Sequence, residues 1–316
     1  MNTRIPLESP LPTTIPEYLD QLRAALRGAD PAMIQDALYD AEEYLRSELA
    51  EQSGKSEAEV IASVAGSYGA PEEVAEIYRD TEVTVNRALR APAPPKRKSF
   101  LGRFFGVIVD PRTYGALFYM LLSLATGIVY FTVVTTGMSM SIGLLVLIIG
   151  IPLLVLFLGL IRVLSLVEGR IVEVLLGERM PRRPLYTQRG KGWLERIKEM
   201  FTDVRTWTAM LYFLLMLPLG IVYFTLAVTG LTMALAFIVA PLAAWTGVAD
   251  IRADVDGWML IGDIGNGITT SVQAWELPFL FVGGFLLLFV MLHLAKGIGK
   301  VHGLLAKHLL VRNPVV

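Results

Sequence analysis

The chain has 316 residues, of which 54% are hydrophobic and 18% are charged, and its mean hydropathy is +0.54. Soluble globular domains carry about 25% charged residues, so this composition favours an integral membrane protein. The net charge of -1 conceals a division, because residues 1–90 hold 17 acidic and 8 basic residues, whereas residues 91–316 hold 12 and 20. The absence of cysteine excludes disulfides, thiolate metal sites and a cysteine nucleophile.

The amino-terminal segment has the pattern of a small soluble module. Residues 1–13 show no helical pattern and are expected to be disordered, while residues 14–90 show the apolar periodicity of four short helices. Capping residues stand at three of the expected helix starts, namely Thr14, Asp30 and Ser56, and Pro71 opens the fourth helix. A core of this size is marginal in isolation, which suggests that the module packs on a partner.

Three features in the module carry a family resemblance: an acidic helix (DALYDAEEYLRSELAEQ), a Gly-Lys-Ser-Glu turn, and the order Gly-Ala-Pro-Glu-Glu-Val-Ala from Gly69. With them, residues 14–82 resemble the HAAS domain, an all-helical signalling module of bacterial membrane proteins that is associated with PadR-like transcription regulators. The resemblance implies a cytoplasmic regulator as partner. The candidate partner-binding residues form an exposed acidic face: Asp36, Asp40, Glu43 and Glu48. A solvated surface without a partner remains the alternative, and direct binding of nucleic acid is disfavoured because acidic residues repel phosphate.

Long apolar segments follow the module. Residues 114–161 contain no charged residue or histidine and are long enough for two spans of about 20 residues. Residues 206–249 form a second such run, and a third uncharged run extends over residues 277–292. We therefore expect an all-α protein with four membrane crossings behind the soluble module.

These segments contain an internal repeat. Residues 110–140 align without a gap on residues 203–233 at an offset of 93, and 17 of the 31 positions are identical. The identical polar pairs include Asp110/Asp203, Arg112/Arg205, Thr113/Thr206 and Tyr119/Tyr212. Farther along, a weak match between the segments from Gly169 and Gly299 has an offset of 130 and predicts a 37-residue insertion in the second repeat.

The repeat sets the expected domain order. It comprises a disordered segment (1–13), a cytoplasmic helical module (14–90), a proline-rich basic linker (91–99), a first membrane repeat (100–180), a cytoplasmic linker (181–192), and a second repeat (193–316) with an outer loop (248–276). Basic residues precede, separate and follow the two repeats, so the positive-inside rule places both chain termini in the cytoplasm. Both repeats then cross in the same direction, as a parallel pair related by an axis along the membrane normal.

Two further segments are amphipathic or ambiguous. Residues 231–247 are apolar enough to span, but a full crossing would place the basic tail outside, so we expect a half-helix or interfacial helix interrupted near Pro241. Residues 166–176 and 298–310 are expected to lie along the inner membrane surface. The three histidines, His293, His302 and His308, are expected to be interfacial.

A second resemblance covers residues 100–312. It rests on Asp-x-Arg-Thr before each repeat, Gly-Ile-Val-Tyr-Phe within it and Gly-Ile-Pro-Leu-Leu from Gly150, which together resemble the bacterial sensor domain. Members of that family precede histidine kinases in some chains and stand alone or beside HAAS modules in others. No kinase follows the last span here, so we expect the output to pass through a partner protein.

The Asp-x-Arg-Thr motifs supply the candidate relay residues: Asp110, Arg112, Thr113, Asp203, Arg205 and Thr206. In a structural interpretation, each Asp caps a spanning helix and each Arg anchors at the level of the lipid phosphates. In a functional interpretation, the paired motifs form a symmetric cytoplasmic ring that relays changes in helix packing to the acidic module.

No motif indicates catalysis, a cofactor or a metal. Residues 252–263 approach the spacing of a calcium loop, but Arg252 stands at its first position, where an acidic ligand is required. Charged residues are missing from the middle of the spans, which disfavours proton relay or ion-coupled transport. The sequence thus predicts a non-enzymatic sensor in the bacterial plasma membrane that contacts lipids and a cytoplasmic regulator, with a homo-oligomer left open. A small-solute or lipid transporter, or a subunit of one, is the alternative, favoured by the repeat symmetry.

Overall fold

The computed structural model describes residues 12–52, 54–89, 100–146, 150–181, 198, 201–246, 252–254, 269–271 and 273–311. The chain divides into two compact units. Unit 1 contains Met1–Pro92, Thr136–Tyr212 and Leu304–Val316, and unit 2 contains Ala93–Thr135 and Phe213–Gly303. The predicted linkers at 91–99 and 181–192 lie outside the described residues, apart from Pro181.

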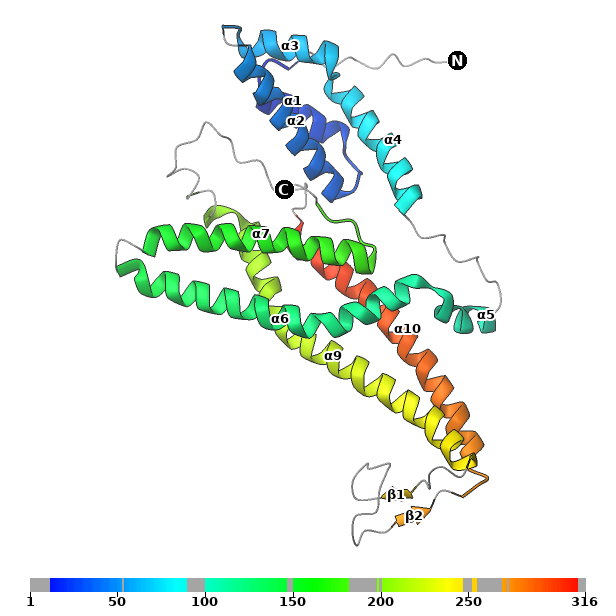
Figure 1. The fold of residues 1–316 in the computed structure, drawn as a ribbon. Coiled ribbons are helices and arrows are strands. Elements are labelled where there is room, and N and C mark those ends of the chain that lie inside the picture. The colour runs from blue at the N-terminus through cyan, green and yellow to red at the C-terminus, as the bar shows by residue number, and fades with distance from the viewer. Residues whose placement is uncertain are drawn as a thin grey trace, which may run out of the picture. The chain divides into compact units, whose positions relative to one another are not determined.

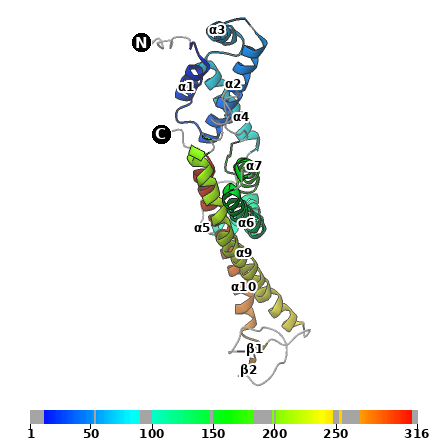
Figure 2. The ribbon, with the colours of Figure 1, turned by 90° about the vertical axis from the view of Figure 1, so that its left-hand side faces the viewer.

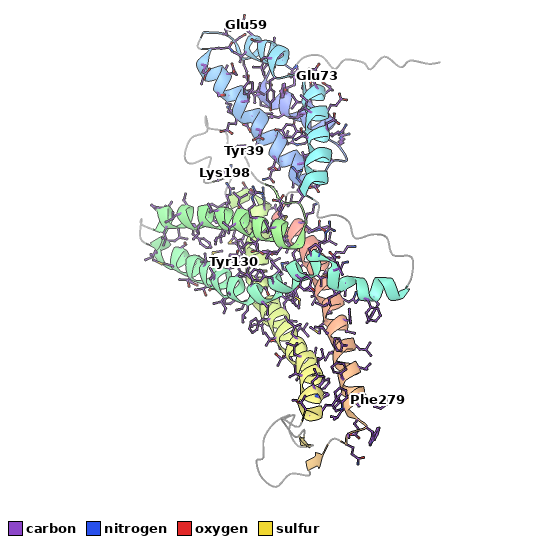
Figure 3. The ribbon with its side chains drawn as sticks, turned by 45° about the vertical axis from the view of Figure 1, so that its right-hand side comes forward. Tyr39, Glu59, Glu73, Tyr130, Lys198 and Phe279 are labelled. Carbon is purple, nitrogen blue, oxygen red and sulfur yellow. The ribbon has the colours of Figure 1, made fainter. Side chains whose placement is uncertain are left out.

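The amino-terminal module consists of four helices, which Figure 1 shows in blue to cyan: α1 (Ile15–Ala25), α2 (Pro31–Glu51), α3 (Glu57–Ser67) and α4 (Pro71–Leu89). The predicted caps are confirmed. Thr14 accepts a hydrogen bond from the Glu17 amide, and Asp30 accepts one from the Ala32 amide at 2.9 Å. Ser56 and Glu59 form a complete capping box at the start of α3. Figure 3 labels Glu59 there, and Glu73 near the start of α4.

The apolar stripes of these helices meet in one core. Its buried members are Ile15, Tyr18, Leu22, Leu26, Met33, Ile34, Ala37, Ala41, Leu45, Val60, Ile61, Val64, Val74 and Ala75. The Tyr18 hydroxyl donates a hydrogen bond to the Gly69 carbonyl at 2.8 Å, which ties α1 to the turn before α4. Burial raises the pKa of Tyr18, so this hydroxyl stays protonated as a donor.

Replacing two glycines of the module by alanine should change its stability in opposite directions. Gly69 has a φ of +112°, and a Cβ there would lie 3.3 Å from the Val74 side chain, so we expect Gly69→Ala to destabilise the module by about 1–3 kcal/mol. Gly66 lies inside α3 with open space around it, so Gly66→Ala should stabilise the module by about 0.5–1 kcal/mol. Hydrogen exchange of α3 and α4 peptides in the full chain measures both effects. Equal exchange in the two variants would contradict this account of the turn.

Four described helices are long and apolar enough to cross a membrane, as the sequence predicts: α6 (Pro111–Gly143), α7 (Gly150–Leu176), α9 (Val204–Trp245) and α10 (Leu277–Leu310). Short helical segments occupy the stretch before α6, namely α5 (Phe100–Phe105) and η1 (Gly106–Val109). A turn of 3-10 helix, η2 (Leu144–Val146), follows α6. In unit 2, α9 and α10 lie side by side (Figures 1 and 2).

The predicted interruption near Pro241 is wrong. Helix α9 continues through both Pro218 and Pro241 to Trp245, so residues 231–245 belong to it rather than to a separate half-helix. A proline removes one helical hydrogen bond, whereas ending the helix in an apolar environment would expose several unpaired backbone groups. The amphipathic stretches 166–176 and 298–310 are likewise continuous parts of α7 and α10.

The two repeats pack their helix pairs in the same way. In unit 1, a Cβ on Gly137 of α6 would collide with the Phe157 ring of α7. In unit 2, a Cβ on Gly230 of α9 would collide with Met291 of α10. The first helices of the repeats are therefore offset by 93 positions and the second helices by 134. The predicted offset of 130 is one helical turn too short, and the insertion is 41 residues long rather than 37.

The inserted loop contains a short antiparallel ladder in which β1 (Arg252–Asp254) pairs with β2 (Thr269–Ser271). The ladder is not anticipated from the sequence. The stretch with calcium-loop spacing begins in β1, and its remaining residues lie outside the described part of the chain.

Candidate functional site

Helices α6 and α9 meet in unit 2 at two glycines that occupy equivalent repeat positions. A Cβ on Gly127 would lie 2.5 Å from the Met216 carbonyl oxygen, and a Cβ on Gly220 would collide with the Ser123 carbonyl. Since Ser123 and Met216 are also related by the offset of 93, the contact is reciprocal. Only glycine allows the two backbones to approach this closely. We call this contact the glycine crossing.

The contacts around the glycine crossing run in reversed order along the two helices. The rings of Tyr130 and Phe213 lie 4.7 Å apart, while Met120 packs in one cluster with Tyr223 (Figure 3 labels Tyr130). The chain directions of α6 and α9 are therefore opposed where the two helices pack. With 33 and 42 residues, α6 and α9 are about 50 and 63 Å long, enough to cross a hydrocarbon layer of about 30 Å at a steep tilt. This reversed order counts against the predicted common direction of the two repeats.

Two buried tyrosines at equivalent repeat positions each bond to the other repeat. In unit 2, the Tyr119 hydroxyl lies 2.6 Å from His302 Nε2. In unit 1, the Tyr212 hydroxyl donates to Glu168 Oε1 at 2.8 Å. The partners His302 and Glu168 are related by the second-helix offset of 134. Each repeat therefore supplies a tyrosine to the other repeat and a partner for the other repeat's tyrosine.

This placement corrects the interfacial assignment of His302. The ring is fully buried and has a second tyrosine partner, because Tyr223 Oη lies 3.4 Å from His302 Nδ1. Glu168 is also fully buried. Ionisable side chains inside a membrane helix bundle are costly and commonly functional. The identity of Tyr119 and Tyr212 in the two repeats was the sequence signal for these pairs, but their partners carry no such signal because one is histidine and the other glutamate.

The aspartates of the two motifs also pair with side chains of the other repeat. Asp110 accepts a hydrogen bond from Lys296 of α10 at 2.6 Å, and Asp203 accepts one from Arg162 of α7 at 3.3 Å. Each aspartate also caps its helix by accepting the amide hydrogen of the arginine two residues later, at 3.1 Å. Burial alone would raise the pKa of Asp110, but the hydrogen bond from Lys296 and the capping bond hold this pKa below 3.8. The ion pair is therefore intact at neutral pH and is lost only as the pH falls through that lowered pKa.

The remaining motif residues differ between the repeats. Thr113 and Thr206 are both buried, and neither hydroxyl has a hydrogen-bond partner within the described part of the chain. Arg112 is exposed, whereas Arg205 makes two side-chain hydrogen bonds. Asp110 belongs to unit 2 and Asp203 to unit 1, so the symmetric ring stays a prediction.

Within unit 1, the start of α2 contacts the ends of the apolar helices. We call this contact the latch, and it consists of three polar pairs: Lys307 Nζ donates to Asp30 Oδ2 at 2.5 Å, Arg205 Nη1 donates to Gln35 Oε1 at 2.9 Å, and Arg179 Nη2 lies 3.5 Å from Asp36 Oδ2. The three cationic side chains come from α10, α9 and the segment after α7. Both repeats therefore contribute to the surface on which the module rests.

Arg205 joins three elements at the latch. Its Nε donates to the Leu310 carbonyl at the end of α10 at 2.9 Å, while its Nη1 reaches Gln35 of α2. A planar guanidinium is suited to such directed bonds in two directions. Sequence reasoning selected Arg205 but missed Gln35, Arg179 and Lys307, which stand outside the repeated motif.

The four acidic candidates for partner binding do not share one exposed face. Asp36 is only 6% exposed and belongs to the latch. Asp40 accepts a hydrogen bond from the Tyr78 hydroxyl at 3.0 Å, and burial raises the pKa of that tyrosine, so it remains a donor. Glu43 is exposed, and Glu48 accepts a hydrogen bond from Gln52. Their role in binding a partner stays a prediction.

The fold and these contacts define a helical membrane protein with a small helical module at its amino-terminal end. Among the residues that the structure describes, no group of three His, Asp or Glu side chains could hold a metal ion. A family model described as "Putative sensor" matches residues 119–310, and one described as HAAS matches residues 17–77. Since the first match covers more than half of the chain, the protein belongs to this sensor family, with a HAAS domain before it. Comparisons with curated proteins and with solved structures found no match.

Proposed function

We propose that this protein is a non-enzymatic membrane sensor whose HAAS domain passes the packing state of the apolar helices to a cytoplasmic regulator. The observation that carries the proposal is the bond pattern of Arg205, which connects α9, the end of α10 and α2 of the HAAS domain. A change in the position of either helix end alters the geometry of at least one of these two hydrogen bonds.

Two continuous helices connect the interior contacts to the latch. Helix α9 carries both Gly220 of the glycine crossing and Arg205, and α10 carries both His302 and Lys307. Each of these helices runs from unit 2 into unit 1, so in this proposal it carries a shift from one set of contacts to the other. A stimulus in the bilayer or at the outer loop that repacks the glycine crossing therefore reaches the latch through helix displacement.

Charge and domain order support the proposed location and partner. Basic residues flank the apolar helices on one side, which supports a bacterial plasma membrane protein with both termini in the cytoplasm. The HAAS domain supports a transcription regulator of PadR-like type as the output partner. The regulator, rather than the acidic domain, would contact DNA.

Transport is the second candidate function, and buried ionisable side chains favour it. Glu168 and His302 lie inside long apolar helices, where such residues often line substrate or ion pathways. Each of these side chains is bonded to a tyrosine, which also fits a purely structural role in helix packing.

The proposed function is tested by affinity capture from detergent-solubilised native membranes, comparing the full chain with a chain that lacks residues 1–90. We expect a transcription regulator to be recovered with the full chain only. Recovery of transport subunits with both chains, and of no regulator with either, would contradict the sensor function and support transport.

A further inference from the structure

The start of α2 presents a polar surface whose complement is already visible in the chain itself. Asp30, Gln35 and Asp36 contact one ammonium and two guanidinium groups within 3.5 Å. Gln35 and Asp36 are 6% exposed, so both side chains are almost entirely removed from solvent while these contacts are made. This surface therefore selects for clustered Lys and Arg side chains, and here it is filled from within the same molecule.

From this geometry we infer that the latch is autoinhibitory: Lys307, Arg205 and Arg179 cover a docking surface on α2, and the occupant after release is a segment of the cytoplasmic regulator that carries clustered Arg and Lys. The inference rests on the proposed function and deepens it by naming the partner's chemistry. The argument is charge complementarity, since the chain's own cations show what the surface binds, and the HAAS segment of residues 1–90 has an excess of nine acidic residues.

The autoinhibition follows from competition within one molecule. Tethering gives the chain's own cations an effective concentration of order 1 mM at the surface, so a basic partner binds weakly while the latch is closed. Displacement of α9 or α10 separates Arg205 or Lys307 from α2 and leaves Asp30, Gln35 and Asp36 open to a partner. Of the four acidic candidates, the exposed Glu43 lies two helical turns beyond Asp36 on the same face of α2 and would extend the surface.

The experiment compares two double variants of the full chain in nanodiscs of zwitterionic lipid. Arg179→Glu with Lys307→Glu removes two latch pairs. Arg170→Glu with Lys300→Glu is the matched control, because it makes the same change of charge at exposed positions outside the latch. The probe is a fluorescent alanine-based helical peptide with two Arg and one Lys on one face, and a version with three Glu serves as its control.

We expect the latch variant to bind the basic peptide about tenfold more tightly than the native chain, because an intramolecular competitor has been removed. The control variant should bind it as the native chain does, and the acidic peptide should bind none of them. Adding Asp36→Asn to the latch variant should weaken binding again. Equal affinity of the native chain and the latch variant, or a gain of the same size in the control variant, would overturn the inference.

A cross-link supplies a second, independent test. The chain lacks cysteine, so Arg27→Cys and His308→Cys, at exposed positions close in sequence to Asp30 and Lys307, are the sites chosen for a cleavable bismaleimide. Joining them should abolish peptide binding, and cleavage should restore it. Peptide binding that persists in the joined protein would contradict a covered surface. If the latch behaves as expected but native membranes yield no regulator, the latch stands and the proposed function fails.

Discussion

Gly127→Val should lower the stability of the membrane helices by about 1–3 kcal/mol, and a larger loss is expected if the helices cannot separate. A valine Cβ at this position would lie 2.5 Å from the Met216 carbonyl oxygen and 2.9 Å from its carbon, so it would meet backbone rather than a flexible side chain. The crossing can accept it only if α6 and α9 move apart, which also disturbs the packing of Tyr130 on Phe213.

The matched control is Gly159→Val, at a position in α7 with open space around it. Thermal melts of the purified protein in one detergent, followed by size-exclusion chromatography, give the comparison. Gly220→Val should behave like Gly127→Val, because each glycine faces a backbone carbonyl of the other helix in the glycine crossing. The account would be contradicted if Gly127→Val had the melting temperature of the native chain while Gly159→Val had a lower one. The glycine crossing would then not be the tight contact of the fold.

Arg205→Ala should uncouple the HAAS domain from the apolar helices with little loss of the fold. The substitution removes the hydrogen bonds to Gln35 and to the Leu310 carbonyl, each worth about 0.5–1.5 kcal/mol or somewhat more for a charged donor. In a chain that carries Arg27→Cys and His308→Cys, cross-linking between the two introduced thiols should slow severalfold in native membranes. Arg205→Lys should fall between, because an ammonium cannot make both directed bonds from one planar group.

Arg112→Ala is the control for this prediction, since Arg112 holds the equivalent position in the first repeat but is exposed. It removes the same charge from the same motif. Its cross-linking rate should match that of the native chain with the same two thiols. Equal slowing in both variants would mean that the motif arginines act through membrane anchoring, as the structural interpretation of the sequence holds, and not through the latch.

Local signals in the sequence were sufficient to predict the helical domains. Thr14, Asp30 and Ser56 cap the helices that they were expected to cap, because a cap depends only on residues a few positions away. The four apolar helices are likewise set by composition. The prediction of an interruption near Pro241 was wrong because it applied the rule that proline breaks helices in water. In an apolar environment, the ends of a broken helix cost more free energy than one missing hydrogen bond.

The contacts between distant segments could be predicted only in part. Identity of Tyr119 and Tyr212 across the repeats marks both positions as important, and the structure gives each a buried polar partner. The partners themselves, Glu168 and His302, differ in chemistry and stand in second helices that are only weakly alike. No periodicity relates Gln35 to Arg205, because their contact joins positions 170 residues apart.

The most direct test of the coupling measures the latch while the glycine crossing is altered. The cross-linking rate of the Arg27→Cys, His308→Cys chain is compared in native membranes with and without Gly220→Ala, and with Gly159→Ala as control. If the HAAS domain responds to the packing of the apolar helices, Gly220→Ala changes the rate severalfold and Gly159→Ala leaves it unchanged. An unchanged rate in the Gly220→Ala protein, with its melting temperature lowered, would show that the crossing had moved without effect on the latch and would contradict the sensor mechanism.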